Sequence, residues 1–549
     1  MIIKTTALTA ALCLGFAGAT DAAEIFVSSN ISTTTFWTSD NTYNLVGQIF
    51  VLPGATLTIQ PGTVIASTTG AGGSLAVSRG AQINALGTAD EPIIFTSTSD
   101  VATWKSGVDG VQDTSRVGEW REAANEWGNL TIMGRGYISE DDPNLMPLNS
   151  PVPAGTNRAF MEGLTPDSPS DTKTLYGGGN DNDDSGSISY LSLRYGGRVV
   201  ALTNELNGLS LGGIGRGTDI SHIDIMNNVD DGIEIWGGTV NIKYANIWNI
   251  GDDSFDIDQG WRGKAQFVCI VQGWSVDANQ GSGVGDNCIE VDGAENSDWQ
   301  PVTTSTIYNA TVIGQPLAGD HGVAYRDGAR LQVRNSIFMD LGEELVKFDN
   351  IDGDGGLGYG NNGTLSWPAV WSTSYTATST VNAPANPAAF YTVQTSGTLS
   401  ELSDSVFFRN FDGGSLGAYD EATARGVLAP SQNNTVVPGF FNYQAPVRNL
   451  QRGDVVVKGG RALIQVVGLD PRPANEALTS VAAAPDDGFF TPAQYRGAFA
   501  PERKPWISGW TAAAAFGFLD PVLDPGQRGS QGAPTGGPTS PFGGAGASL

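Results

Sequence analysis

The chain has 549 residues, of which 16% are charged and 73 are glycine, and its formal net charge is −28. This charge excludes nucleic acid as a partner, because phosphates bind to basic surfaces. It also disfavours anionic lipid surfaces, and it would repel an acidic polysaccharide unless a cation bridged the charges. Few charges, many glycines and the lack of any long helical periodicity favour a β-rich protein with many turns.

The N-terminal segment has the features of an export signal. Lys4 precedes an apolar run over residues 7–17, and small residues follow, so residues 1–22 are predicted to be a secretory signal peptide. We therefore expect an exported protein, located outside the cell or at its surface, with the periplasm as the alternative. No later stretch reaches ~18 consecutive apolar residues, so we expect no transmembrane span after cleavage.

Two cysteines, Cys269 and Cys288, remain after the predicted cleavage. In an exported protein they could form one disulfide. Their spacing does not match the repeat described below, so the sequence leaves the pairing open.

Residues 24–45 are expected to cap the first coil of a repeat that begins in the N-terminal part. "GATLTIQPG" from Gly54 returns as "GAQINALG" from Gly80, which places Leu57 on Ile83. A polar insertion over about residues 100–180 then surrounds one strand-like run, "WGNLTIMG". We expect this insertion to lie on the side of the fold as loops.

The clearest repeat lies in the middle of the chain. "VDDGIEIWGG" (229–238) is followed 22 residues later by "GDDSFDIDQG", and related runs are "LNGLSLGG", "GDNCIEVDG", "GDHGVAYRDG" and "GEELVKFDN". Each run places polar residues and a small residue before an apolar–variable–apolar triplet. A period of this length without amphipathic helices, and shorter than a propeller blade of ~40 residues, predicts a right-handed parallel β-helix.

In such a solenoid, equivalent residues of successive coils stack in columns. One inward column is predicted to contain Ile233, Phe255, Ile289, Val323 and Val346. A second is predicted to contain Ile235, Ile257, Val291, Tyr325 and Phe348. The residue between the two apolar positions of each triplet should point outward.

The predicted fold class is therefore all-β, a right-handed parallel β-helix (solenoid) with an N-terminal cap, a lateral loop insertion and a C-terminal capping segment. The β-helix is expected over 24–467 and the cap over 468–520, where an aromatic stretch is suited to packing over the open end. Residues 521–549 are rich in glycine and proline and are predicted to be a disordered tail.

Three motifs carry a resemblance to a known superfamily: "DDGIEIWGGTVNIKY", "GDDSFDIDQGWRGKAQF" and the closing series "DPRP", "DDGFF", "YRGAF" and "GWT". Over roughly residues 45–480 the chain resembles the pectin-lyase-like superfamily of right-handed β-helix proteins. Within it, the chain is similar to exported bacterial proteins of unassigned role. The resemblance implies the fold and export, but β-helices host many chemistries.

The outward polar column gives the candidate catalytic residues. Its acidic pairs and its histidine resemble the motifs of polygalacturonase-type glycoside hydrolases, on the positions Asp231, Asp252, Asp253 and His321. The resemblance implies Asp252 as general acid, with Asp231 and Asp253 as bases.

The chain departs from the hydrolase pattern in three ways. A further coil with Asp286 and Asn287 separates the acidic pair from the histidine, and Asp320 replaces the glycine before it. Lys347 is retained, but the arginine of the family's basic motif is absent. A uronate would therefore meet little positive charge. The other interpretation is a ladder of aspartate and asparagine turns that is solvated or bridged by ions.

Ca²⁺ is the expected cofactor, because carboxylates around flexible glycines suit a hard cation. Two runs, "DNIDGDGG" and "GGGNDNDDSG", supply the candidate ligands Asp349, Asp352, Asp354, Asp181, Asp183 and Asp184.

Two functions follow from these observations. The first is an exported or surface protein that binds a polysaccharide or cell-envelope ligand with Ca²⁺. The alternative is a polysaccharide-degrading enzyme, a glycoside hydrolase or a lyase, that uses the aspartate cluster. A lyase would need a basic residue, for which Lys243, Arg262 and Lys264 are candidates.

Overall fold

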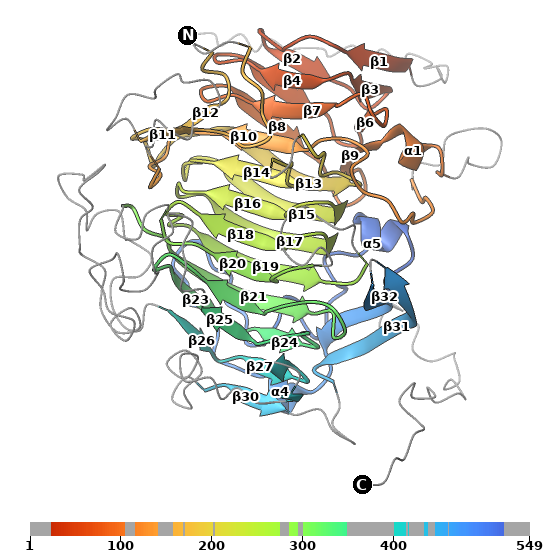
Figure 1. Ribbon diagram of the computed structural model, residues 1–549, viewed down its shortest axis with the longest axis vertical. Coiled ribbons are helices and arrows are strands. Elements are labelled where there is room, and N and C mark those ends of the chain that lie inside the picture. Colours follow the sequence, from red (N-terminus) through yellow and green to blue (C-terminus); the bar gives the residue numbers. More distant parts are fainter. Residues whose placement is uncertain are drawn as a thin grey trace, which may run out of the picture.

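The computed structural model shows parallel strands stacked along the long axis of the molecule (Figure 1). The structure describes residues 23–104, 116–140, 157–167, 171–200, 204–274, 285–294, 300–348, 400–412, 415–416, 433–437, 445–458 and 460–520. The predicted signal peptide and tail lie outside these residues.

One side of the solenoid is a sheet that has nine parallel strands within the described residues. From the N-terminal end it contains β4 (Gln48–Val51), β7 (Ser74–Val77), β10 (Leu130–Met133), β14 (Leu209–Gly212), β16 (Ile233–Trp236), β18 (Phe255–Asp258), β20 (Ile289–Val291), β22 (Val323–Tyr325) and β25 (Val346–Phe348). We call this the short-strand sheet.

The other parallel strands of the solenoid form one larger sheet. Five of its strands are long and bend in the middle, so the two halves of each strand pair with two different rows of strands, which we call ladders. The long strands are β13 (Gly186–Arg194), β15 (Asp219–Asn228), β17 (Asn241–Ile250), β19 (Lys264–Val271) and β21 (Thr304–Ile313). Their first halves continue the ladder of β2 (Thr35–Trp37), β5 (Thr56–Ile59), β8 (Gln82–Leu86), β23 (Arg330–Arg334) and β26 (Glu401–Ser403). Their second halves continue that of β1 (Ala23–Val27), β3 (Asn41–Leu45), β6 (Val64–Ser67), β9 (Ile93–Ser97), β24 (Ile337–Met339), β27 (Val406–Phe408) and β30 (Thr435–Val437).

The bend in the long strands has a backbone cause. Tyr190, His222, Tyr244 and Phe267 occupy equivalent positions, and each has a positive φ between 49° and 65°. A residue in the left-handed region of φ turns the strand, and the residues before and after it stay paired with the neighbouring strands. The two ladders and the short-strand sheet together give the right-handed parallel β-helix that the sequence predicts.

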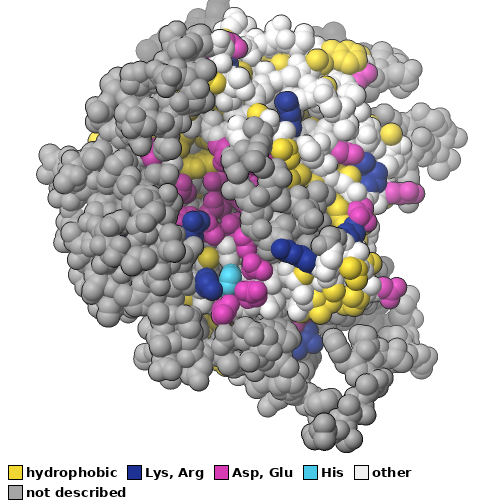
Figure 2. Space-filling view, in the orientation of Figure 1, with side chains coloured by type: hydrophobic (Ala, Val, Ile, Leu, Met, Phe, Trp, Pro, Cys, Tyr) yellow, Lys and Arg dark blue, Asp and Glu magenta, His cyan; other side chains and the backbone are white. Residues whose placement is uncertain are grey.

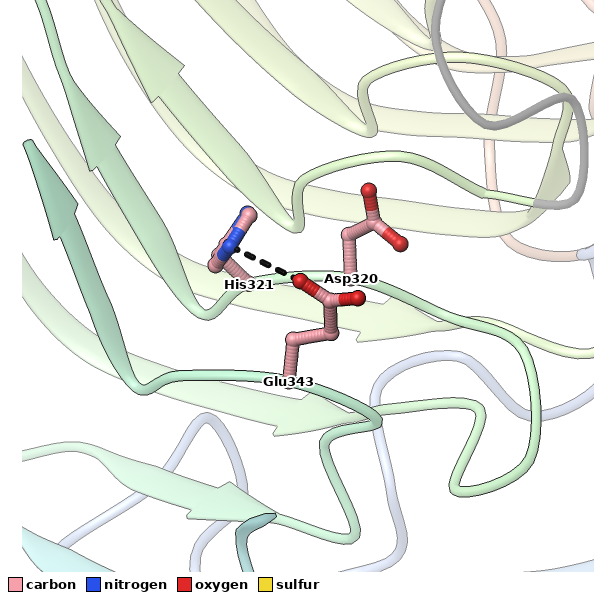
Figure 3. Close-up of side chains that lie close together, drawn as sticks. All are labelled: Asp320, His321 and Glu343. Carbon is pink, nitrogen blue, oxygen red and sulfur yellow. Dashed lines mark ion pairs between the residues drawn. The ribbon is translucent and has the colours of Figure 1, made fainter. Parts of the chain in front are cut away.

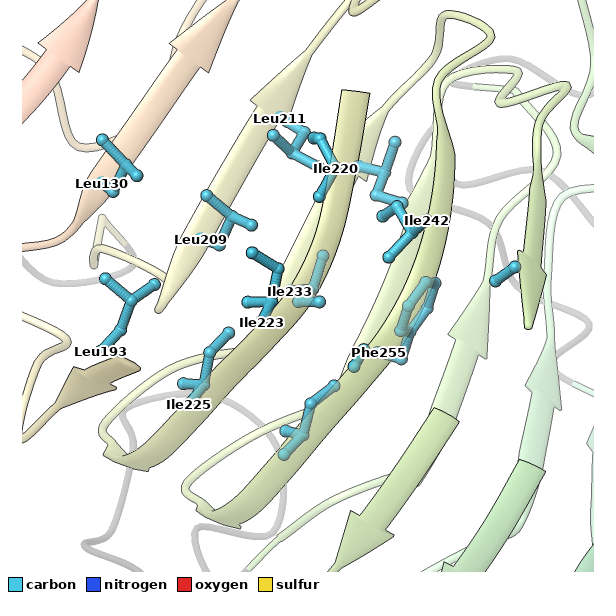
Figure 4. Packing of buried hydrophobic residues seen from close by; sticks show 14 of the residues in the cluster. Leu130, Leu193, Leu209, Leu211, Ile220, Ile223, Ile225, Ile233, Ile242 and Phe255 are labelled. Atoms are coloured by element: carbon cyan, nitrogen blue, oxygen red, sulfur yellow. The ribbon is translucent and has the colours of Figure 1, made fainter. Parts of the chain in front are cut away.

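The predicted apolar columns are confirmed by the strand register. Ile233 pairs with Phe255, and Phe255 pairs with Ile289. The second column is also in register, from Ile235 on Ile257 to Tyr325 on Phe348. Leu57 pairs with Ile83 as expected. Apolar side chains from the short-strand sheet and from the two ladders of the larger sheet meet in one continuous core (Figure 4). Equivalent apolar residues stack because each coil must fill the same close-packed interior.

The insertion over 100–180 contributes more than loops. Its strand-like run forms β10, which lies between β7 and β14 in the short-strand sheet. Before it lies a short helix, α1 (Thr98–Val101), and after it β11 (Arg158–Phe160) and β12 (Leu175–Gly177) form an antiparallel pair.

The C-terminal segment corrects one expectation. After β30, β31 (Val447–Lys458) and β32 (Arg461–Pro473) form an antiparallel hairpin, and the predicted boundary between 467 and 468 falls inside it. The aromatic stretch beyond contains α4 (Glu476–Thr479) and α5 (Ala512–Ala515). In the described part of the chain, this stretch packs against the side of the larger sheet: Trp510 contacts the rings of Tyr190 and His222, and α5 lies beside β15 (Figure 1).

A two-stranded hairpin, β28 (Phe411–Asp412) and β29 (Ser415–Leu416), completes the described elements. Cys269 and Cys288 are both buried and unbridged. Cys288 belongs to the solenoid interior and Cys269 to the cluster beneath the C-terminal segment. None of the described helices has the length and apolar character that a membrane crossing needs.

Candidate functional site

The outer side of the short-strand sheet holds a pocket of about 530 Å³. Among the described residues, its wall includes eleven carboxylates, and we call this set the acidic trough. They are Glu162, Asp230, Asp231, Glu234, Asp252, Asp253, Asp256, Asp258, Asp286, Glu290 and Asp292. Figure 2 shows acidic side chains gathered in the middle of one face, with a histidine beside them.

The first part of the trough is a column on the strands. Glu234, Asp256 and Glu290 pair in register on β16, β18 and β20. Each occupies the middle of an apolar–acidic–apolar triplet, so its neighbours point into the core and it points outward. The β-helix therefore places three carboxylates directly above one another at the strand spacing of about 4.8 Å.

The second part is a column on the turns that precede these strands. Each side chain accepts a hydrogen bond from the backbone N–H of its equivalent on the next coil: Asp231 Oδ1 from Asp253 at 2.9 Å, and Asp253 Oδ1 from Asn287 at 2.6 Å. The column continues to His321, whose Nδ1 lies 2.8 Å from Asn287 Oδ1. This ladder holds the turns in register and fixes the carboxylates in place.

Oxygens from both columns, and from the adjacent turn residues, come close together in four groups. Within each group the atoms lie within 4.8 Å of one another. The groups are Asp230–Asp231–Asp252, Asp231–Glu234–Asp256, Asp252–Asp253–Asp286 and Asp256–Glu290–Asp292. Because they share members, they form one continuous cluster.

Burial and mutual repulsion disfavour the ionised forms. Burial, reinforced by neighbouring carboxylates, raises the pKa of Asp230 and Asp256 to about 7 and that of Asp252 to about 9. The same causes raise the pKa of Glu162 to about 8. The pKa values of three further groups, Asp231, Glu234 and Asp253, are raised well above their ordinary value.

The basic residues in the wall of the trough, as far as it is described, are Arg326 and Lys347. Arg326 forms ion pairs with Glu290 and, at 3.5 Å, with Asp292. Asp252 is only 7% exposed, and its Oδ1 has no hydrogen-bond partner among the described residues. The cluster must therefore share protons or bind a cation at neutral pH.

The structure brings together all four predicted catalytic candidates. Asp231, Asp252, Asp253 and His321 line the same pocket. The extra coil of Asp286 and Asn287 also lies where the sequence places it, between the acidic pair and the histidine.

The predicted calcium ligands have different outcomes. Asp349, Asp352 and Asp354 lie outside the described residues. Asp181 forms an ion pair with Arg262 at 2.6 Å, Asp183 accepts a hydrogen bond from the Arg135 backbone, and Asp184 accepts one from Gly186. These three carboxylates thus have structural partners, and none belongs to the acidic clusters found in the described part of the chain.

Sequence analysis did not single out Glu234, Asp256 and Glu290, although it predicted that they face outward. The signal was present, because an acidic residue at the centre of three stacked triplets must produce a carboxylate column. Glu162 could not be found this way, since it comes from the insertion, which has no repeat to fix its position.

Comparison with protein families agrees with the fold. The family model "Pectate-lyase like beta helix domain" matches residues 29–112 and 114–401. The chain belongs to this family, whose name ties the fold to carbohydrate-related proteins. No curated protein and no solved structure gave a match.

Proposed function

We propose that this is an exported carbohydrate-binding protein whose acidic trough binds Ca²⁺ and, through the ion, an anionic polysaccharide. The observation that carries the proposal is the cluster of buried carboxylates in an open pocket, where Asp252 Oδ1 has no hydrogen-bond partner in the described part of the chain. Export rests on the N-terminal segment described above.

The chemistry of the trough suits a hard cation. Ca²⁺ takes six to eight oxygen ligands at roughly 2.3–2.6 Å, and it accepts carboxylates, carbonyls and water in flexible arrangements. Carboxylate oxygens within 4.8 Å of one another can reach a common ion with small side-chain movements. Binding would remove the repulsion that, together with burial, raises their pKa values.

A polyanion is the ligand that such an ion would favour. The net charge of −28 repels a uronate polymer, so direct contact requires a bridging cation. An ion bound in the open trough keeps coordination positions that sugar carboxylates could fill. A pocket of about 530 Å³ lies within the usual range of roughly 300–1,000 Å³ for small-ligand sites.

The test measures Ca²⁺ binding by calorimetry, followed by retention of a uronate polymer and of a neutral glucan with Ca²⁺ or EDTA. We expect Ca²⁺-dependent retention of the uronate polymer and weaker binding by Asp252→Asn. The matched control is Asp219→Asn, an exposed aspartate on β15. Uronate binding unaffected by EDTA would contradict the proposal.

One observation favours polysaccharide hydrolysis as a second candidate. Burial and nearby carboxylates raise the pKa of Asp252 to about 9, which keeps this group protonated at neutral pH as a general acid requires. Oxygens of Asp231 and Asp252 lie within 4.8 Å of one another, which is nearer the roughly 5–5.5 Å between carboxyl groups in retaining enzymes than the roughly 6.5–9.5 Å in inverting ones.

Lyase chemistry has less support. Arg262 pairs with Asp181, Lys264 pairs with Asp487, and Lys243 donates to the Phe489 carbonyl, so these three basic candidates have partners away from the trough. Incubation with neutral and acidic polysaccharides separates binding from catalysis. Product that forms with the wild type but not with Asp252→Asn, while Ca²⁺ binding persists, would favour the enzyme.

A further inference from the structure

A second cluster of possible ligands lies where the turn column of the trough ends, at His321. It consists of Asp320 and His321 before β22, and Glu343 and Glu344 before β25; we call it the His321 cluster. In Figure 3, His321 and Glu343 point toward one another, with Asp320 beside them. Unlike the four all-carboxylate groups of the trough, this cluster contains an imidazole, which also reaches the wall of the pocket.

The hydrogen bonds of Asn287 determine the form of the ring. Asn287 Nδ2 donates to Glu290 Oε2 at 2.8 Å, so its Oδ1 faces His321 Nδ1 at 2.8 Å. An amide oxygen only accepts, so Nδ1 must carry the proton. In the neutral ring, Nε2 therefore has a free lone pair, the form in which histidine binds metals.

That nitrogen is aimed into the group of carboxylates. His321 is 8% exposed, and its Nε2 lies 3.0 Å from Glu344 Oε2 and 3.3 Å from Glu343 Oε2. Despite these distances, neither Nε2 nor Glu344 Oε2 has a hydrogen-bond partner among the described residues. Asp320 completes the group, with an oxygen within 4.8 Å of both the ring and Glu343.

We propose that the His321 cluster binds a divalent transition-metal ion, for which Zn²⁺ is the probe, through His321 Nε2 and the carboxylates of Asp320, Glu343 and Glu344. Mixed nitrogen and oxygen ligands suit Zn²⁺, whereas Ca²⁺ takes oxygen ligands. Asn287 orients the ring as an outer-shell partner. The His321 cluster borders the trough, because His321 also lines that pocket, but its ligands are not members of the carboxylate groups proposed to bind Ca²⁺.

The simpler occupant is a proton. A protonated His321 would form ion pairs with Glu343 and Glu344 and would need no metal. The two cases make different predictions, because an ion pair would leave Zn²⁺ binding insensitive to the loss of the imidazole.

The experiment titrates the chelator-treated mature protein with Zn²⁺ in a large excess of Ca²⁺, which occupies the trough. We expect one Zn²⁺ per chain, and His321→Gln should weaken binding about tenfold or more. His222→Gln is the matched control, since the His222 ring is stacked between Tyr190 and Tyr244, at 4.1 and 4.3 Å. Asp252→Asn should weaken Zn²⁺ binding much less than His321→Gln does and so separates this site from the trough.

X-ray absorption at the zinc edge provides a second measurement, and one imidazole in the coordination shell is expected. Glu344→Gln serves if His321→Gln fails to fold, and it should also weaken binding. Zn²⁺ binding that is equal in wild type and His321→Gln, or an all-oxygen coordination shell, would overturn the proposal.

Discussion

Two outer faces of the same solenoid bury aspartates in opposite ways. On the larger sheet, Asp224 is fully buried beneath the C-terminal segment and accepts hydrogen bonds from Ser192, Asn246 and the Ala512 backbone at 2.6–2.8 Å. In the turn before β18 of the short-strand sheet, Asp252 is buried among other carboxylates, and one of its oxygens has no hydrogen-bond partner among the residues that the structure describes. A buried acid with donors stabilises the fold, whereas buried acids facing one another call for a ligand.

The stacked columns show the same difference. The rings of Tyr190, His222, Tyr244 and Phe267 stack at centroid distances of 4.1–4.9 Å, and each contact is favourable. The carboxylates of Glu234, Asp256 and Glu290 stack in the same way, and each contact is repulsive when both groups are ionised. Repetition of the coil therefore stabilises the larger sheet through stacked rings, whereas on the short-strand sheet it creates a need for cations.

The largest effect is expected on the larger sheet, where the buried Asp224 has hydrogen-bond donors. Asp224→Ala removes the acceptor for three buried donors, and we expect the free energy of unfolding to fall by about 3–5 kcal/mol. Denaturant unfolding measures this loss, with the exposed Asp219→Ala on the same strand as control. A loss no larger than that of the control would show that the C-terminal segment does not depend on Asp224.

The trough predicts an unusual dependence of stability on pH. Burial and nearby carboxylates raise the pKa values of Asp230, Asp256 and Asp252 from 3.8 to about 7, 7 and 9 in the folded protein. Between about pH 4 and 9 the folded state therefore holds protons that the unfolded chain releases, so the unfolding free energy falls as pH rises.

Without Ca²⁺, we expect the unfolding free energy to fall by several kcal/mol between pH 5 and 8, seen as a Tm lower by several degrees. Added Ca²⁺ should remove most of this loss at pH 8, whereas Na⁺ at equal ionic strength should not. A metal-free protein that gains stability over this range would contradict the account of the trough.

Asp181 distinguishes a structural carboxylate from a calcium ligand. Asp181→Asn leaves the buried Arg262 side chain without its ion pair, so we expect a destabilisation of about 2 kcal/mol. Calorimetry should find Ca²⁺ affinity unchanged. A marked loss of affinity would instead restore the calcium site that the sequence predicts at Asp181, Asp183 and Asp184.

The smallest effect is expected within the strand column. Asp256→Asn removes one charge from between Glu234 and Glu290, so the metal-free protein should gain about 1 kcal/mol of stability at pH 8. The same change should weaken Ca²⁺ binding. Stability and affinity measured on one preparation, beside Asp219→Asn, test for this opposite pair of effects. If both fall together, the charge at Asp256 contributes to the fold itself.

The sequence was sufficient to predict the columns, because a solenoid interior places equivalent apolar residues over one another. The 22-residue shift from Ile233 to Phe255 is the register of β16 on β18. Asp231, Asp253 and His321 were placed in one column by the same reasoning. The repeat thus predicts which residues stack in a column, both inside the solenoid and on its outer face.

Features set by contacts between distant segments could not be predicted in this way. The segment from "DDGFF" to "GWT" was expected over the open end, but its described contacts are with the side of the larger sheet. There Asp224 accepts a hydrogen bond from Ala512, and Trp510 contacts the ring of His222. Glu162 reaches the trough from an insertion without a repeat. Partners such as Arg262 for Asp181, 81 residues apart, also left no local signal in the sequence.

The central claim is that the crowded carboxylates of the trough are a cation site. Anomalous diffraction from crystals soaked in a lanthanide, which mimics Ca²⁺, tests it most directly. We predict a peak between Asp230, Asp231 and Asp252 that is lost in Asp252→Asn. A wild-type crystal with peaks elsewhere and none in the trough would contradict the claim.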